Sequence, residues 1–213
     1  MTETGTNVYD KSAPEGWVPK TTLGRFVLEG KITSIEEIFK NGYKIRESEI
    51  VDILLPNLTN EVLDTAFVQK QTDAGERSRF RVIVASGDMN GHLGVGFGKA
   101  TQWRTAFQKA IKDAKLNMTI VRRGCGSWEC DCDLPHSLPF KVEGRCGGVS
   151  VILLPAPKGL GLVAGDITRV LLKLAGVKDC WVRASGSTRT HSSLVKATFN
   201  ALKSTYELAL QKR

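Results

Sequence analysis

The chain has 213 residues and a formal net charge of +8, with 41% hydrophobic and 24% charged side chains. These fractions are typical of a globular protein with its own core, and no apolar run approaches the roughly 20 residues that span a bilayer, which argues against a membrane protein. The polar N-terminus lacks the apolar segment of a secretory signal, so we expect a cytoplasmic protein with reduced thiols.

The charge is unevenly distributed along the chain. Residues 1–75 carry 8 basic and 12 acidic side chains, residues 76–123 carry 10 and 3, and residues 124–213 carry 12 and 7. The central segment, at net +7, has the positive potential that a polyanion such as RNA requires. A solvated basic surface without a partner is the alternative.

Residues 1–57 are predicted to form an N-terminal arm followed by short helices. The first 20 residues are rich in glycine and proline and read as an extended arm. Ser34 and Glu37 have the spacing of a capping box, which predicts a helix start. A second short helix is expected over residues 47–55, where Pro56 stops it.

Residues 58–123 are predicted to form a small antiparallel sheet covered by one helix. Alternating patterns predict strands at 62–72, 78–86 and 92–98. The helix follows Lys99, with apolar side chains recurring at steps of three and four.

Alternation along the second of these strands separates two kinds of side chain. One face carries Arg77, Arg79 and Arg81, and the other carries apolar residues that would meet the helix. A row of guanidinium groups suits bidentate phosphate contacts, which favours RNA binding. Pairing of the same arginines with carboxylates is the alternative.

A glycine-rich run at residues 94–99 invites comparison with nucleotide-binding loops. Leu93 stands where a Walker loop needs its first glycine, and Ala100 replaces the hydroxyl residue that would hold magnesium. Lys99 stands at the third glycine of a dinucleotide fingerprint. We therefore expect no nucleotide or other small-molecule substrate, and interpret the glycines as allowing a close backbone approach to another chain or to RNA.

Residues 124–139 form a cysteine-rich connection with metal-like character. Cys125, Cys130 and Cys132 offer three thiolates, and His136 or Cys146 would be the fourth ligand of a tetrahedral zinc ion. Ordinary reduced thiols are the alternative, because the spacing is not a common zinc-finger pattern. A catalytic zinc is disfavoured, since no zinc-enzyme signature accompanies the cysteines.

Residues 140–213 are predicted to form a second, βαβα domain. Strands are expected at 149–154 and 177–183, a helix capped by Asp166 runs to residue 174, and a final helix covers 193–210. The loop at 186–190 is polar and contains Arg189, so it could grip a phosphate or serve as a plain capping loop.

Several of these motifs together resemble ribosomal protein five of the small subunit, in its archaeal form. The motifs that carry the resemblance lie at residues 78–84, 87–100, 122–124, 135–136, 144–147, 154–159, 174–176 and 186–189. The resemblance implies an α+β protein, whose first domain is akin to the double-stranded-RNA-binding fold and whose second is βαβα. It identifies residues 73–78 with the family's flexible loop between the first two strands.

The resemblance also implies a function without catalysis or a required cofactor. Family members bind 16S rRNA near the mRNA entry path, contact ribosomal proteins four and eight and mRNA at the entry channel, and support subunit assembly and translational accuracy. A freestanding double-stranded-RNA-binding module and a zinc-dependent enzyme remain the alternatives. The candidate RNA-binding residues, the last two from the polar face of the helix, are Arg77, Arg79, Arg81, Lys99, Arg122, Arg123, Lys158, Arg189, Arg104 and Lys109.

Overall fold

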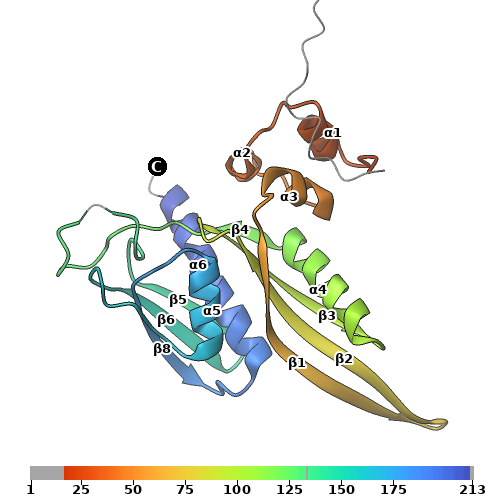
Figure 1. Cartoon of the computed structure of the whole chain (residues 1–213). Coiled ribbons are helices and arrows are strands. Elements are labelled where there is room, and N and C mark those ends of the chain that lie inside the picture. The colour runs from red at the N-terminus through yellow and green to blue at the C-terminus, as the bar shows by residue number, and fades with distance from the viewer. Residues whose placement is uncertain (1–16, 133, 212–213) are drawn as a thin grey trace, which may run out of the picture. The chain divides into compact units, whose positions relative to one another are not determined.

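The structure, a computed structural model, describes residues 17–132 and 134–211 (Figure 1). The chain divides into two compact units, Met1–Leu58 and Thr59–Arg213. Most of the predicted N-terminal arm, residues 1–16, lies outside the described residues. No helix in the described part of the chain has the length and apolar character to cross a membrane.

The first unit contains the helices α1 (Thr22–Leu28), α2 (Ile35–Lys40) and α3 (Ser48–Leu54). The predicted helix start at Ser34 is confirmed, because the Glu37 amide donates to Ser34 Oγ at 3.4 Å. The return bond of the capping box differs, since Glu37 Oε2 accepts from the Thr33 amide at 3.2 Å rather than from the Ser34 amide. Helix α1 was not expected from the sequence pattern.

The Glu47 side chain binds the segment that precedes α1. Its carboxylate accepts hydrogen bonds from Trp17 Nε1 at 3.0 Å and from the amides of Lys20 and Thr21 at 3.0 and 2.7 Å. Burial acts to raise the pKa of Glu47, but these bonds and one from the Thr21 side chain outweigh it and lower the pKa. The segment before α1 is thereby tied to the start of α3.

The second unit begins with an antiparallel sheet, in the order β1-β2-β3-β4. Its strands are β1 (Thr59–Thr72), β2 (Gly75–Gly87), β3 (His92–Ala100) and β4 (Met118–Ile120). Helix α4 (Trp103–Leu116) covers one face, and its Ala106 and Ala110 are buried against Val82 and Val84 of β2. The predicted sheet with one helix is confirmed, with longer strands than expected and β4 in addition.

The glycines of β3 permit a close approach of α4. Cβ atoms added at Gly94, Gly96 and Gly98 would lie 2.2, 2.0 and 1.9 Å from backbone carbonyl oxygens of the helix. The expected close backbone contact is therefore present, but the neighbour is the chain's own helix, and the expectation of RNA or another chain at this position was wrong. Alanines at 106, 110 and 114 face the glycines, since only small side chains fit such a narrow gap.

A second sheet follows in the order β5-β6-β8-β7, with two helices on one face (Figure 1). Its elements are β5 (Val142–Cys146), β6 (Val149–Pro155), β7 (Leu162–Val163), α5 (Asp166–Leu174), β8 (Cys180–Gly186) and α6 (His191–Gln211). The βαβα order is confirmed by β6, α5, β8 and α6, and β5 and β7 add strands at the two edges.

Asp166 does not cap α5 as predicted. The N-cap residue is Gly165, and no side chain supplies a capping hydrogen bond. Asp166 instead lies in the first turn, fully exposed, with Oδ1 3.9 Å from Arg169 Nη1. It favours the helix through its negative charge near the N-terminal amides rather than through a cap.

Both sheets contribute to one large hydrophobic core. Ile83, Ala85 and Leu93 of the first sheet are buried in the same cluster as Leu153 of β6 and Leu171 of α5. Because Ile83 and Ala85 alternate with Val82 and Val84, they share a face of β2 with Arg81. The predicted division of β2 into an apolar face and a basic face therefore holds only for the half of the strand up to Arg81.

Candidate RNA-binding surface and metal-ligand cluster

A long β-hairpin projects from the first sheet (Figure 1). Strand β3 pairs with β2 only from Phe80 to Gly87, so among the described strands residues 68–72 and 75–79 pair solely with each other. The tip is a two-residue turn that leads into Gly75 at φ +107°. The segment expected to be a flexible loop, residues 73–78, is thus mostly regular strand, and exposed Lys70 and Arg77 are paired across it.

Three of the predicted basic residues meet at the end of β3. Arg79 of β2, Lys99 of β3 and Lys109 of α4 border a surface hollow of about 400 Å³. None of the three has an ion pair with a described carboxylate. The hollow also contains Gln102, which precedes α4 without a side-chain capping bond, so amides of the first helical turn lie beside the cations. Cations and free helix amides are the two groups that bind phosphate most readily.

Arg81 has a different environment from Arg77 and Arg79. Its Nη2 lies 3.8 Å from Asp64 Oδ2 on the neighbouring strand, and its Nε is buried without a hydrogen-bond partner. The other oxygen of Asp64 lies 3.2 Å from Nδ1 of His191, the first residue of α6. The alternative of carboxylate pairing therefore applies to Arg81, and the acid comes from strand pairing rather than from nearby sequence.

The two adjacent arginines after β4 also differ. Arg123 Nη2 donates to Asn90 O and Oδ1 at 3.1 and 2.6 Å, and Nη1 reaches Gly176 O at 3.5 Å. Its guanidinium thus joins the β2–β3 turn to the end of α5. The Arg122 side chain is exposed, while its amide donates to Thr205 Oγ1 at 3.1 Å. Of the pair, Arg122 has the exposed side chain, whereas the guanidinium of Arg123 is engaged in contacts within the protein.

The remaining basic candidates are exposed but separate from the hollow. Arg104 lies on α4, Lys158 in the loop between β6 and β7, and Arg189 before α6. In the loop with Arg189, Thr190 O accepts from the amides of Ser193 and Leu194. These are the first backbone bonds of any helix, so phosphate binding by this loop stays a prediction.

The cysteine-rich connection brings four potential metal ligands together. The ligand atoms of Cys125, Cys130, Cys132 and His136 all lie within 4.8 Å of one another. An isolated bridge between Gly124 and Ser137 closes the base of this loop. Cys146, the alternative fourth ligand, ends β5 and is not part of the cluster.

Hydrogen bonds alter the acidity of two of these thiols. Bonds from the Cys132 thiol and from the Lys158 amide lower the pKa of Cys130 to about 6. The same contact with Cys130 raises the pKa of Cys132 to about 11. One thiol of the pair therefore gives up its proton readily, as metal binding requires.

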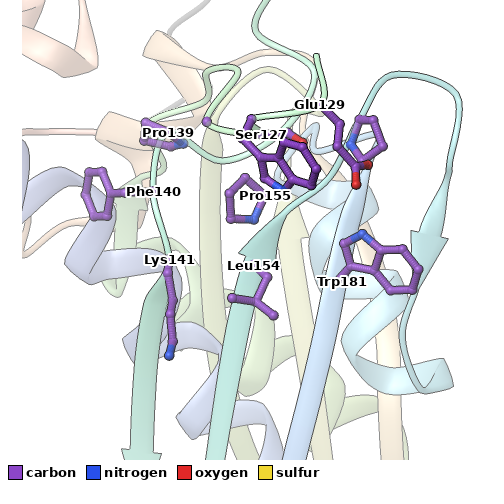
Figure 2. Close-up of a pocket in the computed structure, with 11 residues that line it drawn as sticks. Ser127, Glu129, Pro139, Phe140, Lys141, Leu154, Pro155 and Trp181 are labelled. Carbon is purple, nitrogen blue, oxygen red and sulfur yellow. The ribbon is translucent and has the colours of Figure 1, made fainter.

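An aromatic hollow of about 680 Å³ lies beside this cluster, on the face of the second sheet away from its helices. Figure 2 shows Trp181 and Leu154 on adjacent strands, below the loop that carries Ser127 and Glu129. The loop residue between those two, Trp128, is 92% exposed. The segment between the potential ligands Cys125 and Cys130 thus forms one wall of the hollow.

Comparison with known proteins identifies the family. The model of the ribosomal protein S5 N-terminal domain matches residues 58–122, and that of the S5 C-terminal domain matches residues 144–212. Small ribosomal subunit protein uS5 of Pyrobaculum islandicum is 59% identical over 190 residues, 89% of this chain and 94% of that protein. The chain belongs to the uS5 family. The corresponding proteins of Staphylothermus marinus and Thermofilum pendens are each 56% identical, over 93% and 90% of this chain and 92% and 95% of their own lengths.

Membership of the uS5 family confirms the resemblance seen in the sequence motifs, including its archaeal character. The uS5 family is a family of structural ribosomal proteins, so this chain is not an enzyme. The zinc-enzyme alternative is thereby removed.

Sequence reasoning missed two residues of these sites. Lys70 lies opposite Arg77 in the hairpin. A two-residue turn at residues 73–74 fixes the register of the two strands, so this pairing could have been predicted from the sequence. Asp179 contacts His136, but no spacing signal connects residues 43 positions apart. Only the tertiary structure identifies Asp179 as part of the cluster.

Proposed function

We propose that this chain is a structural constituent of the cytoplasmic small ribosomal subunit that binds 16S rRNA near the mRNA entry path. Through this binding it supports subunit assembly and translational accuracy. Membership of the uS5 family supports the ribosomal assignment. The observation that carries the RNA-binding role is the hollow in which Arg79, Lys99 and Lys109 converge.

The hollow suits recognition of backbone phosphate rather than of bases. Its three cations come from β2, β3 and α4, so the rigid sheet and helix fix their spacing. Threonine and glutamine side chains at the start of α4 add neutral donors beside them. Contacts of this kind set the position of an RNA helix and follow its shape.

The projecting hairpin extends the same basic surface away from the core. Lys70 and Arg77 are exposed and paired near its tip, where no other described strand covers them. A cationic arm of this kind can hold a single RNA strand without nucleotide hydrolysis, which fits mRNA at the entry channel. Ribosomal proteins four and eight of the small subunit complete the proposed set of partners, on the strength of the family.

RNA binding by these cations requires no cofactor. A zinc ion in the cysteine cluster would stabilise the fold rather than bind RNA. The cluster and the lining of the basic hollow share no residue and come from different segments of the chain.

The test uses the full chain and 16S rRNA over a range of salt concentrations. Replacement of Arg79, Lys99 and Lys109 by alanine should weaken binding and reduce the slope of log affinity against log salt by roughly 0.7 to 0.9 for each phosphate that is no longer neutralised. Replacement of Lys40, Lys173 and Lys203, which are exposed and outside the hollow, removes the same charge and serves as the control. Equal slopes for the two triple variants would contradict the proposed site.

Sedimentation separates this proposal from a freestanding RNA-binding module. In a lysate fractionated on a sucrose gradient at high salt, we expect near-stoichiometric chain in the small subunit and in translating ribosomes. Residence only in the light fractions would contradict a ribosomal role and support the freestanding module.

A further inference from the structure

The cysteine-rich loop of residues 124–139 carries a complete set of tetrahedral metal ligands. We infer that Cys125, Cys130, Cys132 and His136 bind one structural zinc ion, and that this ion fixes the loop to the second sheet through Asp179.

The distances between ligand atoms fit a zinc tetrahedron. With zinc–sulfur bonds of about 2.3 Å, neighbouring ligand atoms lie about 3.8 Å apart. Cys125 and Cys132 Sγ are 3.7 Å apart, as are Cys130 Sγ and His136 Nε2. The Sγ atoms of Cys130 and Cys132 are 2.8 Å apart, so a small rotation of either side chain completes the geometry. That separation is too long for a disulfide of about 2.05 Å.

The histidine is already held in the orientation that metal binding needs. His136 is buried, and its Nδ1 lies 2.7 Å from Asp179 Oδ2, which directs Nε2 toward the thiols. A carboxylate behind the second ring nitrogen is the usual support of a zinc-binding histidine, because it fixes the tautomer and strengthens the ligand. Four protein ligands leave no position open to substrate, so the site is structural.

Asp179 extends the effect of the ion to the neighbouring loop. Its Oδ1 accepts from the amides of Gly159 and Gly161 at 3.1 and 2.8 Å. The same region is joined through Ser137, whose Oγ donates to Asp179 O at 2.6 Å and accepts from the Ala156 amide at 3.1 Å. The cluster therefore connects residues 125–136, the loop after β6 and the start of β8.

The loop needs such a connection, because it has almost no regular structure of its own. Apart from the bridge between Gly124 and Ser137, none of its described residues belongs to a helix or strand. A metal ion replaces the missing core in small segments of this kind, and in a reducing compartment it does so where a disulfide would not persist. By closing the segment from Cys125 to Cys130, the ion also holds the wall of the aromatic hollow shown in Figure 2.

The first experiment measures metal in the full chain, purified under reducing conditions without chelator and reloaded with zinc. We expect one zinc ion per chain by elemental analysis. Replacement of zinc by cobalt should produce the thiolate-to-metal charge-transfer absorption and the intense visible bands of a tetrahedral site. Absence of bound zinc, or a cobalt spectrum without thiolate absorption, would overturn the inference for the wild-type chain, with no dependence on the folding of any variant.

Cysteine variants then test which residues are ligands. Cys130→Ser and Cys132→Ser should lose the metal or bind it with a weaker thiolate absorption, whereas Cys146→Ser should keep the metal and the full absorption, since Cys146 lies in β5 outside the cluster. Loss of metal in Cys146→Ser, or its full retention with undiminished absorption in Cys130→Ser, would overturn the proposed ligand set.

Discussion

Oδ2 of Asp179 lies 2.7 Å from Nδ1 of His136, and both side chains are buried. The pair joins the cysteine-rich loop to the strand that starts at Cys180. In the inferred zinc site Asp179 is a positioning residue, since it acts on the metal through the histidine ring.

Asp179→Asn should weaken zinc binding by roughly 10 to 100-fold, because the amide orients the imidazole less firmly. Competition against a chelator of known affinity measures this change, and the cobalt spectrum reports whether the ligand set is kept. Asp166→Asn is the matched control, since that carboxylate is fully exposed in α5. Equal zinc affinities for the two variants would show that Asp179 has no effect on the metal.

Gly96→Ala should destabilise the first sheet by about 1 to 3 kcal/mol or more, the range for overpacking a core. The added Cβ would lie 2.0 Å from Ala110 O and 2.3 Å from Ala114 N, so α4 would have to move. The free energy of unfolding in urea measures the loss. Gly148→Ala is the control, because nothing lies within 4 Å of its Cβ position. The proposed role of the glycine contact fails if both variants unfold at the same urea concentration.

Arg122→Ala and Arg123→Ala should have separable effects, although the residues are adjacent. Arg123→Ala removes hydrogen bonds to Asn90 and Gly176 and should lower the free energy of unfolding by about 1 to 3 kcal/mol. Arg122→Ala should leave stability within about 0.5 kcal/mol, because its side chain is exposed, and should reduce the salt dependence of RNA binding. Urea unfolding and filter binding measure the two effects, and a reversed pattern would contradict both assignments.

Acid should weaken the β2–β3 turn through Asp88. Burial acts to raise the pKa of Asp88, but a hydrogen bond from the His92 side chain and others from the Asn90 and His92 amides outweigh it, so the pKa is lowered. A carboxylate with a lowered pKa contributes stability that is complete above its ordinary pKa of 3.8 and is lost as the pH falls through the lower value.

Asp88→Asn should therefore lose less stability than the wild type between about pH 5 and about pH 2, as measured by urea unfolding at each pH. Asp73→Asn, at the exposed hairpin tip, should follow the wild-type curve. If the free energy of unfolding fell by the same amount for the wild type and Asp88→Asn over this pH range, this role of Asp88 would be contradicted.

Much of the fold follows from local patterns. Alternation located β2 and β3, and the helical period located α4, because each pattern reports which side of a single element meets the core. The helix start at Ser34 was predicted for the same reason, since the bonds of Glu37 there join residues three and four apart. Short edge strands such as β7 carry too few residues to show a period, so they were missed.

For the candidate sites, too, the sequence predicted some features and only the tertiary structure decided the others. Residue type alone indicated a basic RNA-binding surface and a cluster of thiols, because charge and metal-binding chemistry belong to the side chains themselves. Which arginines are free was decided by the tertiary structure, since Asp64 reaches Arg81 by strand pairing and Asn90 reaches Arg123 across a turn. That His136 rather than Cys146 lies beside the three thiols was decided in the same way, because ligand atoms must come within a few ångströms and chain folding alone sets those distances.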